Sequence, residues 1–191
     1  MLIAKIIGYI SIAFWLFPPF RQYKRLFFYY FLILAISDPF ALFCVQILGR
    51  SPQLIYPIAG LLLFYAINPS KTALRRFWAV HMIFITGFSI CFFYFENLLY
   101  LTLIMHLLIL FKFVRIVMLK AYGMLTLNIF HLALIFYELS VVINLLEFLG
   151  NNDFRVVIYY ITLTFQIIMA IFFTIFTEKS DLLIIRLKSA D

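Results

Sequence analysis

The sequence predicts an all-α integral membrane protein built as a seven-transmembrane-helix bundle. Hydrophobic residues make up 66% of the 191 positions and charged residues 12%, whereas a soluble domain carries about 45–50% apolar and about 25% charged residues. Apolar stretches approaching the roughly 20 residues of a spanning helix follow one another with short polar segments between them. These stretches do not alternate with period two, which excludes a membrane β-barrel.

The predicted spans form a single transmembrane domain, followed by a charged cytoplasmic tail, 178–191, that extends the last helix along the membrane surface. The third stretch is short and contains Pro57 and Gly60. It therefore either crosses the membrane fully or forms a broken or re-entrant helix. In chain order, the spans are about 2–19, 26–48, 53–68, 77–95, 98–118, 124–148 and 155–177.

The prolines predict kinked helices in the first three spans, because proline removes a backbone donor and clashes with the preceding turn. All six prolines precede residue 70, so the last four spans should be straighter. In the second span, Pro39 frees a carbonyl near Ala35, and the Ser37 hydroxyl is placed to satisfy the backbone there.

The basic residues predict an outside N-terminus and a cytoplasmic C-terminus. With this orientation, twelve of the fifteen Lys and Arg residues lie on the inner side and three, Lys5, Arg50 and Arg155, on the outer side, as the positive-inside rule requires. The net charge of +7 is thereby explained without a nucleic-acid partner. We expect a multi-pass protein of a bacterial inner membrane or an equivalent membrane.

Polar side chains within the sixth span are the most informative functional signal. Asn128, His131 and Glu138 are spaced by three and seven residues and fall within about 80° of one another on a helix. A polar stripe on an apolar helix should face protein or water. It predicts either a proton path, solute path or ligand pocket centred on Glu138, or hydrogen bonds that join neighbouring helices.

A candidate intramembrane site would form if acidic and basic groups of other spans met this stripe. Asp38 on the second span and His106 on the fifth lie at a similar estimated depth to Glu138. Gln166 on the seventh span could hydrogen-bond Glu138. Each ionisable group at bilayer depth needs a partner, because its insertion costs about 2.5–3.5 kcal/mol.

Lys112 and Arg115 are three residues apart on the fifth span, near its predicted inner end. Their long side chains either reach to the membrane surface or bind an anionic lipid head group. Cys44 and Cys91 both fall inside spans toward the same side, so they are either separate buried thiols or a disulfide pair.

The aromatic residues predict a scaffold. Those near span ends should form interfacial belts, and the phenylalanines in mid-span should face lipid or a partner subunit. The proposed belt consists of Trp15, Tyr23, Trp78, Tyr94, Tyr100 and Tyr122.

No sequence motif indicates a metal site, a haem or a catalytic nucleophile, so we expect no cofactor and no enzymatic activity. The topology resembles that of rhodopsins, but the last span, 155–177, lacks the lysine that holds retinal in that family.

These observations predict an accessory or structural subunit, or a small sensor-like module, of a larger membrane assembly. Its expected partners are membrane lipids and other membrane protein subunits. Two alternatives stay open. One is a small-solute or proton-coupled transporter that uses Asp38, His106, Glu138 and Gln166. The other is a lipid-modifying membrane enzyme based on His, Asp and Glu chemistry.

Overall fold

The computed structural model shows a helical protein, and four of its helices are long and apolar enough to cross a membrane. They are α3 (Phe28–Leu48), α7 (Leu98–Met124), α8 (Ile129–Gly150) and α9 (Arg155–Ile175). The prediction of a mostly helical protein with apolar helices of membrane-spanning length is confirmed at this level. The structure describes residues 2–49, 51–67, 76–150 and 155–186.

Shorter apolar helices occupy the other predicted spans. They are α1 (Leu2–Trp15) with the single turn α2 (Pro18–Arg21), α4 (Ile55–Ala66) and α6 (Trp78–Tyr94). At 1.5 Å per residue, the 12 residues of α4 measure about 18 Å. This length is less than the roughly 30 Å of a bilayer core.

The helix breaks follow the prolines. The predicted first span is two helices, because α1 ends at Trp15 and α2 begins on Pro18 and Pro19. A helix start tolerates proline, whose missing N–H has no partner there in any case. In α3, which contains Pro39, the Ser37 hydroxyl donates to the carbonyls of Ile33 (2.8 Å) and Leu34 (3.1 Å), not to that of Ala35.

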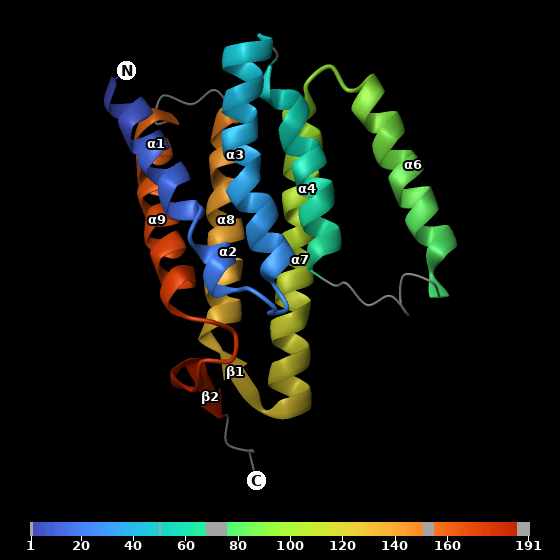
Figure 1. The fold of residues 1–191 in the computed structure, drawn as a ribbon. Coiled ribbons are helices and arrows are strands. Elements are labelled where there is room, and N and C mark those ends of the chain that lie inside the picture. The colour runs from blue at the N-terminus through green and yellow to red at the C-terminus, as the bar shows by residue number, and fades with distance from the viewer. Residues whose placement is uncertain (1, 50, 68–75, 151–154, 187–191) are drawn as a thin grey trace.

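The helices pack around α7 and α8 (Figure 1). Helix α7 packs on α8 and α4, helix α9 lies between α8 and α1, and α3 packs on α4. The first and last helices of the chain, α1 and α9, are therefore neighbours. Helix α6 stands apart at the edge of the bundle. Helix α7 extends beyond its neighbours at the end of the bundle where the chain's C-terminus lies.

Phenylalanine rings form a buried core toward the ends of the predicted spans. Mid-span phenylalanines such as Phe40 and Phe136 are exposed, and the expectation that they face lipid or a partner stays a prediction. Phe27, Phe31, Phe113, Phe130 and Phe173 are fully buried and contact one another through tilted, stacked or edge-on rings. Such ring pairs contribute about 0.5–1.5 kcal/mol each beyond the area they bury.

Trp15 is the member of the predicted aromatic belt that the structure places elsewhere. Its side chain is only 5% exposed and lies 4.7 Å from the Tyr137 ring, centre to centre. The indole is part of the aromatic core. The belt residues Trp78, Tyr94 and Tyr122 are exposed as expected.

The predicted helical tail is wrong, because α9 ends at Ile175 and the chain then folds back on the bundle. A 3-10 turn (Asp181–Leu183) leads into β2 (Ile184–Arg186), which pairs antiparallel with β1 (Thr126–Asn128). The sequence carries no strong strand signal in either three-residue segment. Residues 187–191 of the predicted tail lie outside the described part.

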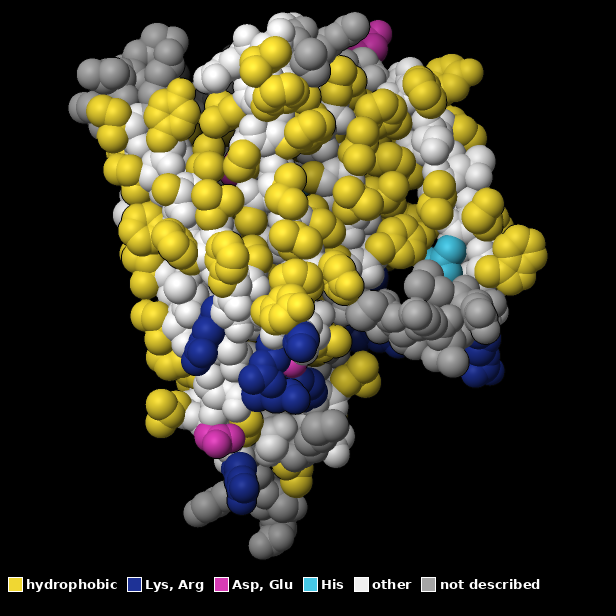
Figure 2. Space-filling view, in the orientation of Figure 1, with side chains coloured by type: hydrophobic (Ala, Val, Ile, Leu, Met, Phe, Trp, Pro, Cys, Tyr) yellow, Lys and Arg dark blue, Asp and Glu magenta, His cyan; other side chains and the backbone are white. Residues whose placement is uncertain are grey.

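Contacts between distant segments gather basic residues at this end of the bundle, here called the basic end. Arg21 Nε donates to the Ile175 carbonyl (3.3 Å), and the Gln22 amide donates to the carbonyls of Phe173 (3.0 Å) and Phe176 (2.8 Å). Carbonyls at the end of α9 are thus satisfied by side chains from α2 and the residue after it. Figure 2 shows Lys and Arg side chains in the lower part of the molecule, below a mostly apolar surface.

Candidate functional site

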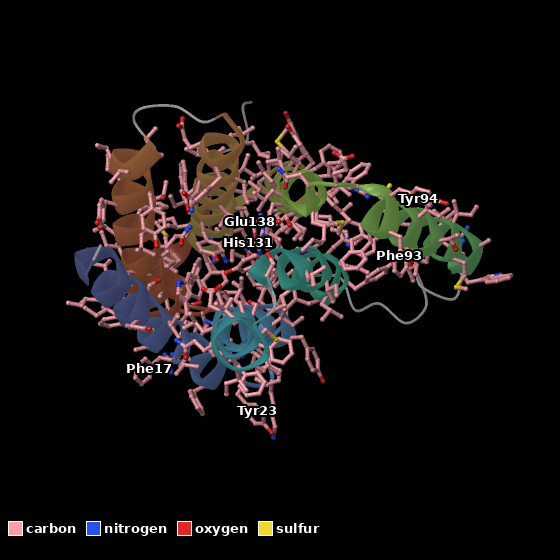
Figure 3. All side chains as sticks on the ribbon, turned by 90° about the horizontal axis from the view of Figure 1, so that it is seen from above. Phe17, Tyr23, Phe93, Tyr94, His131 and Glu138 are labelled. Carbon is pink, nitrogen blue, oxygen red and sulfur yellow. The ribbon has the colours of Figure 1, made fainter. Side chains whose placement is uncertain are left out.

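The most unusual polar group of the bundle is Glu138, whose side chain is fully buried in α8. Its carboxylate joins two other helices. One oxygen accepts a hydrogen bond from the Tyr30 hydroxyl of α3, and the other lies 2.8 Å from Nδ1 of His106 on α7. We call Tyr30, His106 and Glu138 the buried triad. Figure 3 shows Glu138 among the helices, whereas Phe93 and Tyr94 lie on the distant α6.

The surroundings of the triad explain why its members must pair. Tyr30 is fully buried, and its ring meets those of Phe31 and Phe113 edge-on at 5.4 and 5.3 Å. A carboxylate in such apolar surroundings is stable only when its oxygens are hydrogen-bonded or paired. The triad does both, so it ties α3, α7 and α8 together and can hold a proton between the carboxylate and the imidazole.

Asp38 does not join the triad. It follows Tyr30 by eight residues on α3, which is about 12 Å of helix rise, and the structure shows no hydrogen bond from it to Glu138 or His106. It lies within electrostatic range of the phenols of Tyr56 and Tyr137. Of Asp38, His106 and Glu138, which the sequence places at similar depth, the structure therefore brings together the last two.

Gln166 contacts Ser140 of α8, whereas the sequence predicted a hydrogen bond to Glu138. Its amide nitrogen is 3.5 Å from the hydroxyl of Ser140, and that hydroxyl donates to the Tyr137 carbonyl at 2.7 Å. The interaction between the sixth and seventh predicted spans is thus present, but it is made by Ser140, two residues from Glu138 and on a different side of α8.

Asn128 and His131 form hydrogen-bonding contacts at the start of α8. Asn128 lies before the helix, where Oδ1 accepts from the Phe130 N–H (2.9 Å) and Nδ2 donates to the Glu178 carbonyl (2.7 Å). Nε2 of His131 lies 3.2 Å from the Lys120 ammonium. The predicted stripe therefore consists of separate contacts, because Glu138 is bonded to α3 and α7 whereas these two residues bond at the basic end.

The Lys112 side chain contacts the neighbouring helix α4. Its ammonium donates to the Phe64 carbonyl at 2.6 Å and lies 3.4 Å from the centre of the Phe64 ring. It thereby satisfies a carbonyl in the last turn of α4, where a cation is favourable. Arg115, one turn further along α7, is exposed.

The described residues hold no group of three or more His, Cys, Asp or Glu side chains placed to bind a metal ion. Cys44 and Cys91 are free thiols.

Tyr30 is the site residue that sequence reasoning missed. It lies in the aromatic run Phe27-Phe28-Tyr29-Tyr30-Phe31, in which Tyr29 is 58% exposed and Tyr30 is fully buried. The helical spacing of Phe27, Tyr30 and Phe31 marks one face. Because every neighbour is also aromatic, the pattern does not show which face is buried.

Comparison of this chain with models of protein families, with curated proteins and with solved structures found no match. The interpretation of the site therefore rests on its own geometry.

We expect Tyr30→Phe to lower the free energy of unfolding by about 1–3 kcal/mol, because it leaves a buried oxygen of Glu138 without its donor. Tyr29→Phe is the matched control, since the same hydroxyl is removed from the adjacent exposed ring, and it should change stability by less than about 0.5 kcal/mol. Unfolding in detergent micelles measures both variants. In a Glu138→Leu background the effect of Tyr30→Phe should disappear; equal effects of the two tyrosine variants would show that the triad contributes nothing.

Proposed function

We propose that this chain is a non-enzymatic accessory or structural subunit of a larger membrane assembly, and that α6 is the helix through which it binds its partner. The observation that carries the proposal is that no residue of α6 is buried, although the helix is apolar along its length. In a membrane, such a helix has its sides available to lipid or to helices of another protein.

Helix α6 has two different faces. The face toward the bundle carries rings that contact side chains of α4. Phe84 lies 5.2 Å from Phe64, centre to centre, and Nδ1 of His81 lies 3.3 Å from the Tyr65 hydroxyl. These contacts orient α6 on its own subunit. The helix therefore presents a defined second face away from the bundle.

The outward face combines small and aliphatic side chains. Thr86 and Gly87 lie in a shallow hollow of about 380 Å³ bordered by Met82, Ile83 and Ile90. A Cβ added at Gly87 would meet no atom within 4 Å. Small residues let the backbone of a second membrane helix approach closely, so the occupant that we propose is a transmembrane helix of another subunit.

The interior of the bundle also favours a scaffold. The buried triad joins α3, α7 and α8, the Gln166–Ser140 contact joins α9 to α8, and the Lys120–His131 contact joins α7 to α8 a second time. Contacts of this kind fix helices relative to one another. They support a rigid subunit whose polar groups serve packing.

The same proposal includes seven membrane crossings with the N-terminus outside and the C-terminus in the cytoplasm. It is supported by the basic end, where the segments carrying Arg21, Lys24, Arg25, Lys179 and Arg186 meet.

Cysteine labelling in intact cells tests this topology. With Cys44 and Cys91 replaced, a cysteine at Lys24 or Lys179 should react only with reagents that cross the membrane, and one at Glu96 should react with impermeant reagents. If the cysteines at positions 24 and 179 were labelled from opposite sides of the membrane, the proposed topology would be contradicted.

Partner binding is tested by purification from the native membrane in a mild detergent. We expect a stoichiometric membrane protein with the unmodified chain and its loss with Gly87→Trp, because the indole fills the hollow on α6. Ile168→Trp is the matched control, since it adds the same side chain at an exposed position of α9, and it should keep the partner. A monodisperse monomer from native membranes, or a partner retained by Gly87→Trp, would contradict the proposal.

A further inference from the structure

The place where α4, α6 and α7 meet holds a positive charge deep in the membrane region. If α7 enters the bilayer near Leu98, a core of about 30 Å ends near residue 118. Lys112 then lies about 9 Å inside that boundary. Its side chain does not extend along α7 toward the basic end, because the ammonium is held on the carbonyl and ring of Phe64.

Phe64 connects the three helices at this point. It belongs to α4, its ring packs against Phe84 of α6, and the same ring carries the ammonium of Lys112 from α7. Figure 2 shows Lys and Arg side chains at the lower end of the opening between α6 and the bundle. The Lys112 side chain is half-buried, so its ammonium is not sealed within the core.

No carboxylate among the described residues forms an ion pair with Lys112. The ion pair found in that part of the chain joins His106 and Glu138 instead. A carbonyl dipole and an aromatic ring stabilise an ammonium but leave its net charge unchanged. A cation inside the hydrocarbon region favours a nearby anion, because attraction between opposite charges is strong where the dielectric constant is low.

Arg115 completes a binding geometry for a phosphate. It lies three residues, about 4.5 Å of rise, nearer the basic end than Lys112 and within 60° of it around the helix. Its side chain is exposed. A guanidinium can bind two phosphate oxygens at once, and an ammonium below it adds a point charge.

The surface beside these cations suits acyl chains. Leu107 and Phe111 are exposed on α7 within about 80° of Arg115, and Ile85 is exposed on α6. A lipid bound here would place its head group at Arg115 and its chains along this apolar surface. A soluble phosphate would gain no contact from the apolar part.

We propose that this junction is a binding site for one anionic phospholipid, whose phosphate lies between the Lys112 ammonium and the Arg115 guanidinium in the leaflet at the basic end. The site explains why a lysine is held at this depth. It does not use the hollow at Thr86 and Gly87, whose lining residues all belong to α6.

Native mass spectrometry of the purified full chain tests the site with phosphatidylglycerol, phosphatidylcholine and inorganic phosphate as probes. We expect one phosphatidylglycerol to be retained per chain, with weaker retention of phosphatidylcholine and no competition by inorganic phosphate. Arg115→Gln and Lys112→Met should each weaken phosphatidylglycerol binding about fivefold or more. Lys112→Met keeps the apolar stem, and Arg115→Gln changes an exposed side chain, so its folding is not in question.

Lys179→Gln is the matched control, because it removes one exposed charge from the basic end without touching the junction. Its lipid binding should equal that of the unmodified chain. Equal retention of the two lipids, or an equal loss in Lys179→Gln and Arg115→Gln, would reduce the effect to general surface charge and overturn the proposal. Competition by inorganic phosphate would assign the site to a soluble anion and overturn it as well.

Discussion

The structure depends on one constraint: a carboxylate inside a membrane bundle must find its partners within the protein. Glu138 meets it by accepting from Tyr30 and pairing with His106, so that three long helices share one polar centre. Removing one partner from such a group is costly, because the remaining charge stays buried. The relative positions of α3, α7 and α8 are therefore defined more sharply than apolar packing alone would define them.

The features that could be predicted from the sequence are those governed by local physics. Composition and the length of the apolar runs indicated a helical membrane protein, and the prolines marked the break between α1 and α2. The high insertion cost of a carboxylate singled out Glu138, and similar depth along two spans brought His106 into consideration. Both residues belong to the triad.

What could not be predicted depends on contacts between distant segments. Tyr30 is one of several adjacent aromatics, and only the packing of α3 shows that it faces inward. Asp38 was placed by depth alone, which ignores how far α3 is shifted along its axis relative to α8. Lys112 was expected to reach the membrane surface or a lipid head group, and its bond to the Phe64 carbonyl could not be foreseen because it depends on where the short helix α4 ends. The strands β1 and β2 exist only through their pairing.

Solid-state NMR of the chain in lipid bilayers tests the central claim most directly. With nitrogen-15 in the histidines and carbon-13 in the glutamate carboxyl groups, the dipolar coupling reports the distance between an imidazole and a carboxylate. The structure predicts a strong coupling at Nδ1 of His106, consistent with its 2.8 Å contact with Glu138, that disappears in Glu138→Gln. Absence of that coupling, with the Glu138 carboxyl instead close to lipid acyl chains, would contradict the account.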